Sequence, residues 1–422
     1  MTRTSVHPAQ RVPDPAVDAG RWPDIAAVPR SPARAAVARG IFHRAVRRLS
    51  LRVVEPDGRT YGGGGADAPV MRLLRPGAFF ARLGETGTIG FGEAYMARDW
   101  DAEDLTGVLS AFAAHLRELV PASLQRLRHA VLRRMPSHQD NTVEGARANI
   151  HHHYDLSNEL FATFLDDSLT YSSALFSGEP YGNAGGLADA QHRKIDRLLD
   201  AAAVGPGTTV LEIGSGWGEL ALRAAGRGAR VTTVTISTEQ AHLARERIAA
   251  AGLGDRVDVQ LRDYRQVRGS YDAVVSVEMI EAVGANHWDE YFATLDRALR
   301  PGGRVGLQAI LQDDDTVRAT GDTYTWIRKY IFPGGQIASA AAVARVLARA
   351  TSLRIADEYT FGRHYAETLR RWRSRFEAAA ADIAALGFDE TFRRMWSLYL
   401  AYSEAGFRTG YLDVAQFTLT KA

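Results

Sequence analysis

The chain has 422 residues, of which 46% are hydrophobic, which is enough for a substantial core and for more than one folded unit. Its formal net charge is only +2, so the overall charge selects no class of partner. It contains no cysteine, which excludes disulfides and thiol nucleophiles and is compatible with a reducing cytoplasm.

The first segment, residues 1–25, is polar and proline-bearing, and it has no apolar stretch of the kind found in signal peptides. We therefore predict a disordered tail here. Because no run of about 18 apolar residues occurs in the sequence, we expect no span across a bilayer. These features together predict a cytoplasmic protein.

A small α+β unit is predicted for residues 26–140. Ser31-Pro32 is a good helix start, with Ser as the N-cap and Pro at the first helical position. The helix after it should place Val37, Ile41, Ala45 and Leu49 on one apolar face. Strands are predicted at 51–54 and 70–74, separated by a glycine run at 61–65, and helices at 105–120 and 124–135.

The segment 135–141 is typical of a linker and places a domain boundary near residue 140. Beyond it the chain alternates between helices and strands, with strands predicted at 208–213, 230–235, 257–261, 273–277 and 304–310. This alternation indicates a parallel, doubly wound α/β sheet, to which residues 414–420 would add an antiparallel strand. Residues 149–167 precede the first strand and are predicted to cover the ligand end of the sheet as a lid.

The first predicted strand of this sheet closes with Glu212 and runs into a turn that contains Gly214, Gly216 and Gly218. Glycines in such a turn allow positive φ and let the backbone approach a ligand closely. The spacing E-x-G-x-G-x-G differs from the G-x-G-x-x-G of dinucleotide sites and is the form used for S-adenosylmethionine. We therefore predict a Rossmann-like class I methyltransferase domain at residues 141–422, with Gly214, Ser215 and Gly216 in its cofactor site.

The next two strands end in further candidate cofactor residues. Many nucleoside folds place an acid after the second strand to hold the ribose hydroxyls, but here Thr235 and Ile236 stand in that region and Gln240 is the nearest polar candidate. After the third strand, Asp263 can accept from an adenine amino group and Tyr264 can stack on the base. A solvent-facing loop aspartate is the alternative for Asp263.

Two carboxylates, Glu278 and Glu281, follow the fourth strand, where α/β sheets place their chemistry. If a helical turn starts there, residues three apart face the same way. An acid favoured by a helix dipole is the alternative, and it explains one glutamate more easily than two.

Six segments together resemble the cyclopropane-fatty-acyl-phospholipid synthase family, which also contains mycolic acid cyclopropane synthases and fatty acid methyltransferases that form 10-methylene acyl chains. The segments are 153–161, 169–174, 212–218, 281–284, 330–335 and 364–365. The resemblance covers roughly residues 60–422 and is strongest from residue 150.

The resemblance implies roles for individual residues. S-adenosylmethionine would be held by Tyr171, Ser172, Gly214, Gly216, Thr235, Ile236, Gln240 and Asp263. Glu281 and Tyr365, with the backbone near Ile310, would organise a bound bicarbonate that acts as general base. A lid that brings His153 and Tyr154 toward the active centre is the preferred interpretation of that segment.

Three positions depart from the family pattern. Ser173 stands where cyclopropanating members usually have Cys, Gln308 where many bacterial members have His, and Glu278 where bacterial cyclopropane synthases commonly have Gly. Gln cannot titrate and Ser is smaller than Cys, so the bicarbonate site is altered. The added carboxylate of Glu278 either accepts the proton itself or repels bicarbonate. Plant-type cyclopropane synthases look similar around Glu278 and Gln308, so only Ser173 separates the two products.

We predict that the enzyme methylates an oleoyl phospholipid and then loses a proton, giving a 10-methylene acyl chain, the precursor of tuberculostearic acid. Cyclopropane synthesis is the main alternative. A small-molecule methyltransferase and a non-catalytic lipid-binding protein are weaker ones, because the C-terminal third offers aromatic side chains that suit an acyl tunnel. These are Trp326, Phe332, Trp372, Phe376, Trp396, Tyr399 and Tyr402.

The arginine-rich segments 34–48 and 126–134 are either solvated faces or contacts for an anionic phospholipid surface. We expect peripheral membrane association and no nucleic-acid partner, because no recognisable nucleic-acid module accompanies them. A 10-methylene product would require a reductase partner, a flavoprotein, to become a methyl branch. The oligomeric state stays open, a homo-oligomer included. His151–His153 with Asp155 do not predict a metal site, because consecutive histidines cannot easily face one ion.

Overall fold

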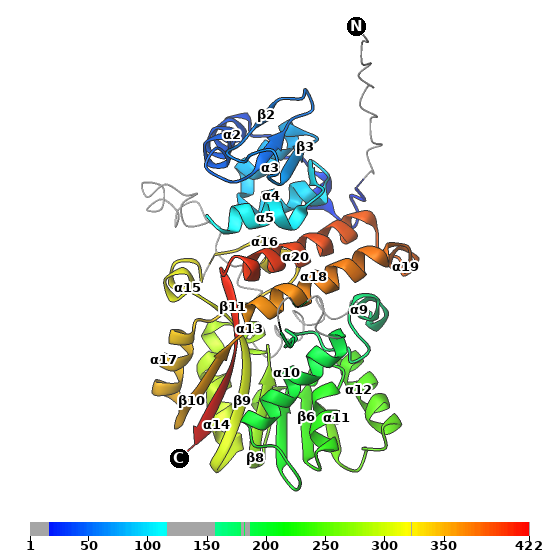
Figure 1. Cartoon of the computed structure of the whole chain (residues 1–422), viewed down its shortest axis with the longest axis vertical. Helices are drawn as coiled ribbons and strands as arrows, with labels where there is room; N and C mark the ends of the chain where they lie inside the picture. The colour runs from blue at the N-terminus through cyan, green and yellow to red at the C-terminus, as the bar shows by residue number, and fades with distance from the viewer. Residues whose placement is uncertain (1–16, 116–156, 179–180, 182–185, 322, 422) are drawn as a thin grey trace.

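The computed structural model describes residues 17–115, 157–178, 181, 186–321 and 323–421, and its larger part is built on a seven-stranded sheet (Figure 1). The strand order is β10-β11-β9-β8-β5-β6-β7. The strands are β5 (Thr209–Ile213), β6 (Arg230–Thr235), β7 (Val257–Leu261), β8 (Tyr271–Val277), β9 (Leu299–Gln312), β10 (Leu353–Thr360) and β11 (Leu412–Lys421). Strands β5 to β9 pair in parallel, whereas β11 is antiparallel to β9 and β10. The predicted parallel sheet with an antiparallel final strand is therefore confirmed.

Helices cover both faces of this sheet, as a doubly wound fold requires. One face carries α10 (Leu187–Ala201), α11 (Glu219–Gly226) and α12 (Thr238–Ala250), whose apolar residues form one core with the sheet. The other face carries α14 (Trp288–Ala298) and α17 (Ala340–Ala350), which form a second core. The parallel strands all end at one edge of the sheet, so the loops that follow them lie together there.

The edge strand β10 is not among the predicted strands. Of its residues only Leu353 is buried, and Arg354, Asp357 and Glu358 are exposed. An edge strand does not need a continuous apolar row, so this one lacks the alternation by which strands are recognised.

The N-terminal unit is an α+β fold with a four-stranded sheet in the order β2-β1-β3-β4. Its elements are α1 (Pro23–Ala26), α2 (Pro32–Val46), β1 (Arg52–Val54), β2 (Thr60–Tyr61), β3 (Val70–Leu73), α3 (Pro76–Thr86), α4 (Thr88–Met96), β4 (Trp100–Ala102) and α5 (Leu105–Ala113). The strands predicted at 51–54 and 70–74 are confirmed, whereas α3, α4 and β4 were not predicted. The helix predicted for 105–120 already ends at Ala113. The helix predicted for 124–135, the linker at 135–141 and the boundary near 140 lie outside the described residues.

The predicted face of α2 is wrong. Its buried residues are Ala38, Phe42 and Val46, whereas Val37 is 62% and Ile41 is 44% exposed. The inward face is set by the large ring of Phe42, which packs edge-on against two phenylalanines of α3 at centroid distances of 5.2 and 5.7 Å. The predicted Pro at the first helical position is present, but Ser31 makes no side-chain capping hydrogen bond within the described residues.

The disordered tail predicted for residues 1–25 is wrong for its last residues, 22–25. Residues 23–26 form α1, and the side chain of Ile25 is buried at 1% exposure. The indole of Trp22 donates to Asp389 Oδ2 at 2.8 Å. These contacts attach residues 22–26 to the folded protein.

Three C-terminal helices lie between the N-terminal unit and the large sheet, namely α16 (Trp326–Tyr330), α18 (Gly362–Ala378) and α20 (Glu390–Arg408) (Figure 1). A single hydrophobic core joins α18 and α20 to the N-terminal unit. The aromatic helix predicted at 392–407 lies within α20. The remaining elements are α9 (Asn158–Phe164), α13 (Ile280–Val283), α15 (Asp314–Thr320), α19 (Ala380–Ala385) and the short 3₁₀ turns η3 (Tyr264–Gln266) and η4 (Ala285–His287). Among the helices of the described residues, none has the length and apolar character needed to cross a bilayer.

Candidate active site

A cavity opens at the carboxyl ends of β5, β6, β7 and β8. All ten residues predicted to hold the cofactor line it: Tyr171, Ser172, Gly214, Ser215, Gly216, Thr235, Ile236, Gln240, Asp263 and Tyr264. Glu278 lines the same cavity, together with Lys194 and Glu212, which were not among the predicted site residues. The sheet topology explains this, because parallel strands deliver their carboxyl-terminal loops to one edge.

The glycine turn after β5 forms the floor of this cavity. Gly214 and Gly216 have φ of 95° and 49°, in the left-handed region that glycine adopts without steric cost. A Cβ on Gly214 would lie 2.6 Å from Cγ of Met279, so a larger residue has no room there. The turn therefore exposes backbone to the cavity, as a nucleoside-binding turn must.

Glu212 carries an unpaired polar atom beside this turn. The residue is 2% exposed, and within the described residues its Oε2 is buried without a hydrogen-bond partner. Burial raises the pKa of the Glu212 carboxyl to about 8. A buried polar atom without a partner is costly, so this oxygen is suited to accept from a donor group of a bound ligand. The lining therefore fits a nucleoside-like cofactor such as S-adenosylmethionine.

The two cavity residues predicted to contact ribose and adenine already have protein partners. Gln240 Oε1 accepts from Thr235 Oγ1 at 2.9 Å, which orients the amide at the end of β6. Both carboxylate oxygens of Asp263 accept from Arg265, at 2.9 Å from Nε and 2.7 Å from Nη2. Asp263 is thus a buried, ion-paired residue rather than a solvent-facing one.

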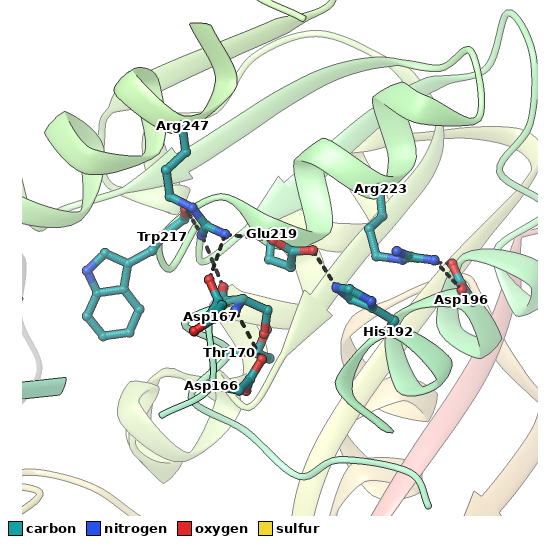
Figure 2. Close-up of polar contacts among 10 residues, drawn as sticks. Asp166, Asp167, Thr170, His192, Asp196, Trp217, Glu219, Arg223 and Arg247 are labelled. Carbon is teal, nitrogen blue, oxygen red and sulfur yellow. Dashed lines mark hydrogen bonds and ion pairs between the residues drawn. The ribbon is translucent and has the colours of Figure 1, made fainter. Parts of the chain in front are cut away.

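Arg247 of α12 forms hydrogen bonds that hold residues 166–170, the segment before Tyr171 (Figure 2). Its guanidinium donates to the carbonyl of Trp217 at 2.7 Å, to the carbonyl of Ser168 at 3.1 Å and to Glu219 Oε2 at 2.7 Å. The other oxygen of Glu219 lies 2.8 Å from His192 Nε2. The described end of the predicted lid lies close by, since Trp217 Nε1 donates to Asn158 Oδ1 at 2.7 Å.

Four of the predicted catalytic residues meet at the carboxylate of Glu278. Its Oε1 accepts from the backbone N–H of Ser173 at 3.0 Å and from Gln308 Nε2 at 2.8 Å. Its Oε2 accepts from the Tyr365 hydroxyl at 2.6 Å. These partners come from the segment before α10, from β9 and from α18, so the cluster could not be recognised from local sequence.

Glu281 lies beside this cluster in α13. Its Oε1 accepts from the backbone N–H of Ile310 at 2.5 Å, and its Oε2 is buried without a partner in the described part of the chain. Burial and the neighbouring charge of Glu278 raise the pKa of Glu281 to about 8. The two glutamates are therefore close enough to influence each other, but they have different surroundings.

Lys194 is the buried cation of the site. It is 1% exposed, and its Nζ donates to Ser172 Oγ at 2.6 Å. Burial lowers the pKa of the Lys194 ammonium to about 8, against the opposing effect of the Glu278 charge. Sequence reasoning missed it, although lysine occurs at only two other positions of this arginine-rich chain, Lys329 and Lys421.

Aromatic rings border the cavity on the side of Tyr171. Its hydroxyl lies 2.7 Å from that of Tyr399, and its ring centroid lies 5.3 Å from that of Trp372. Of the residues predicted for an acyl tunnel, Trp396 is fully buried in the same cluster. Trp326 instead packs against the N-terminal unit, donating to Met96 Sδ, and Tyr402 is 41% exposed. His153, the remaining predicted catalytic residue, lies outside the described residues, as do His151, Tyr154 and Asp155.

Comparison with known proteins identifies the family of this chain. Residues 141–417 match the family model described as mycolic acid cyclopropane synthetase. The chain is 52% identical over 417 residues to the tuberculostearic acid methyltransferase UfaA1 of Mycobacterium tuberculosis, covering 97% of this chain and 98% of that protein. It is 33% identical over 359 residues to the cyclopropane-fatty-acyl-phospholipid synthase of Escherichia coli, covering 84% and 88% of the two chains.

Solved structures agree with these relatives. The cyclopropane synthase MmaA2 from Mycobacterium tuberculosis matches with a TM-score of 0.60 and 30% identity, over 65% of this chain and 98% of that one. The mycolic acid cyclopropane synthase CmaA1, complexed with SAH and CTAB, matches with a TM-score of 0.60, 31% identity and the same coverage of 65% and 98%. The family resemblance and the class I methyltransferase fold predicted from the sequence are both confirmed. The chain belongs to the mycolic acid cyclopropane synthetase family of S-adenosylmethionine-dependent methyltransferases.

Proposed function

We propose that this enzyme transfers a methyl group from S-adenosylmethionine to the double bond of an oleoyl phospholipid and, after loss of a proton, leaves a 10-methylene acyl chain on the phospholipid. The observation that carries the proposal is the position of the Glu278 cluster. It lies at the wall of the cofactor cavity, next to the aromatic rings around Tyr171, where an apolar chain would be received. The near-full-length likeness to a tuberculostearic acid methyltransferase supports the choice of product.

Each group of residues has a separate task in this proposal. S-adenosylmethionine, held by the glycine turn and by Gln240 and Asp263, supplies a methyl group on a positively charged sulfur. An alkene is a weak nucleophile, so the protein must align it with that methyl group. The rings of Tyr171 and Trp372 exclude water and present faces that stabilise a cation on the acyl chain. A carboxylate must then remove a proton.

The balance of atoms shows how one cation leads to two products. Methyl transfer forms a carbon–carbon bond at one alkene carbon and leaves the positive charge on the other. If a hydride moves from the methylated carbon to its neighbour, the charge becomes tertiary, and loss of a proton from the new methyl group forms an exocyclic double bond. If no hydride moves, loss of a proton from the same methyl group closes a cyclopropane ring. The products therefore differ in whether the hydride shift precedes deprotonation.

Acyl-chain analysis tests this proposal. Purified enzyme is incubated with oleoyl phospholipid vesicles and S-adenosylmethionine, and the acyl chains are analysed by mass spectrometry before and after mild hydrogenation. We expect a product of one added carbon that takes up two hydrogens on reduction. A product of the same mass that resists mild reduction would instead establish cyclopropane synthesis, the function suggested by the Escherichia coli relative.

We further propose that α2 meets an anionic phospholipid surface. Its exposed side carries Val37 and Ile41 together with Arg34 and Arg44, and exposed Arg48 follows the helix, a combination that suits a lipid headgroup layer. Flotation should show more binding to anionic than to neutral vesicles, and a variant with Val37→Ser and Ile41→Ser should bind less. Equal binding to both vesicle types would contradict this.

The 10-methylene product also implies a partner, because converting it into a methyl branch needs a reductant that this chain does not supply. We propose a flavoprotein reductase. Coexpression with such a reductase should convert the methylene product into a saturated methyl branch, and methylene chains that stay unreduced would argue against that partner.

A further inference from the structure

The backbone of Glu278 adopts a conformation that is unfavourable for a residue other than glycine. Its φ of 50° lies in the left-handed region, where an L side chain crowds its own backbone. Glycine would adopt this conformation freely, yet the position carries one of the larger polar side chains. Strained backbone of this kind persists where the surrounding structure enforces it, and it gathers at functional sites. The strain places a carboxylate directly at the cavity wall.

A chain of hydrogen bonds from Arg197 of α10 through Gln416 of β11 fixes how the Gln308 amide faces this carboxylate. Arg197 has donors only, so the Gln416 atom that faces it at 2.8 Å must be the amide oxygen. The Gln416 nitrogen then faces Gln308 Oε1 at 3.0 Å, which turns the Gln308 nitrogen toward Glu278. The backbone N–H of Ser173 is a second obligatory donor to the same oxygen. Both donors require an acceptor, and Oε1 of Glu278 accepts from both of them.

One lone pair of Glu278 stays available. A carboxylate accepts at about four positions, and the donors described are Ser173, Gln308 and the Tyr365 hydroxyl. Glu281 is the other carboxyl nearby, and burial beside Glu278 raises its pKa to about 8, which keeps Glu281 protonated at neutral pH. The two carboxyls thus differ in their surroundings: Glu278 accepts from three described donors, and Glu281 accepts from the backbone N–H of Ile310.

We propose that Glu278 is the proton acceptor of the reaction, so that the enzyme needs no bicarbonate. The inference rests on the proposed function. After the hydride shift, the carboxylate takes a proton from the carbon delivered by the methyl donor, and the electron pair of that C–H bond becomes the π bond of the exocyclic double bond. The proton returns to solvent before the next turnover.

The experiment compares three forms of the full-length enzyme with oleoyl phospholipid vesicles and S-adenosylmethionine, in carbonate-free buffer and with added sodium bicarbonate. We expect the wild-type rate to be the same in both buffers within about twofold. Glu278→Gly relieves the strain and opens a space beside Ser173, Gln308 and Tyr365. Without bicarbonate the rate of Glu278→Gly should fall about 100-fold, the usual scale for losing a general base. Added bicarbonate should raise it to at least a tenth of the wild-type rate.

Glu278→Gln is the matched control, because it fills the same space with an amide that cannot accept a proton. Its rate should fall equally and should not recover with bicarbonate. Binding of S-adenosylmethionine, measured by calorimetry, verifies that each variant is folded. A wild-type rate that collapses in carbonate-free buffer and returns with bicarbonate would overturn the assignment without any variant, and so would full activity of Glu278→Gly without bicarbonate. Failure of the wild-type enzyme to methylate oleoyl chains in either buffer would instead overturn the proposed function, and this assignment with it.

Discussion

Two glutamates three residues apart have different roles because their partners differ. Among the described residues, three donors from distant segments bind Glu278, whereas Glu281 has one, the backbone N–H of Ile310. The sequence predicted that both would lie near the chemistry, and the structure places both beside the cavity. It could not predict which one is stabilised as a carboxylate, because that depends on Gln308 and Tyr365, which lie far away in the sequence.

The raised pKa of Glu281 predicts a pH effect on stability. Its carboxyl binds a proton more tightly in the folded than in the unfolded chain, so its contribution is fully present below its ordinary pKa of 4.5 and is lost as pH rises through about 8. Glu281→Gln cannot titrate. We expect the melting temperature of the variant minus that of the wild type to increase steadily between pH 5 and pH 8. A constant difference across that range would show that the Glu281 pKa is ordinary.

Lys194 should lower the pKa of the neighbouring Glu278 carboxyl. Its positive charge lowers the pKa of Glu278, while burial, the largest effect, raises it. Replacing Lys194 with Met removes the lowering effect, so the acid limb of the kcat/KM profile should move to higher pH. Lys421→Met is the control, because Lys421 binds Asp296 and the carbonyl of Leu299 away from the cavity. Superimposable profiles for Lys194→Met and wild type would exclude this role.

At the scale of elements, the parallel strands were predictable and the edges were not. Strands β5, β6 and β7 carry valine and other β-branched or apolar residues between turn signals, and their predicted ranges agree with the structure within one residue. β10 is a charged edge strand without an apolar pattern. In α2, the buried face is the one that contains Phe42, not the one with the most regular apolar spacing. The cavity-lining residues between Gly214 and Tyr264 were predictable because they follow strand ends, and Tyr171 and Ser172 came from the family resemblance. Lys194 lies within a helix and gives no such signal.

The loop 166–170 depends on α12 for its position, which makes Arg247 testable. Arg247→Met removes the donors to Ser168, Trp217 and Glu219, and hydrogen bonds from a charged group are each worth about 1.5–3 kcal/mol. We expect affinity for S-adenosylmethionine to fall about tenfold or more, and hydrogen exchange in 166–175 to become faster. Arg245 lies on the same helix as Arg247, and Arg245→Met, which loses only a bond to the carbonyl of Val259 in β7, should leave both unchanged. Unaltered affinity in Arg247→Met would show that the loop is held by other contacts.

At the scale of the whole molecule, the N-terminal unit and the C-terminal helices share one core. Arg394 of α20 donates to the carbonyls of Tyr95 and Trp100, and Thr106 donates to Glu404. Local sequence patterns describe each unit alone and cannot show that α20 faces both. The predicted boundary near residue 140 therefore separates two segments of the sequence. The described residues on its two sides nevertheless pack against each other.

Gly92 provides a test of this shared core. A Cβ there would lie 2.4 Å from the Trp326 ring, so Gly92→Ala should lower the free energy of unfolding by about 1–3 kcal/mol, the usual cost of overpacking. We expect one cooperative transition at a lower temperature. Gly77→Ala is the control, since its Cβ meets nothing within 4 Å. A separate early transition of the N-terminal unit alone would contradict the shared core.

The central claim is most directly tested by following the carbon that is transferred. Purified enzyme is given S-adenosylmethionine labelled with carbon-13 in the methyl group and vesicles of oleoyl phospholipid, and the extracted lipid is examined by carbon-13 NMR. We predict that the label appears in an olefinic CH₂ group of the acyl chain. A label in a cyclopropane ring carbon, or an unlabelled acyl chain despite binding of the methyl donor, would contradict the account.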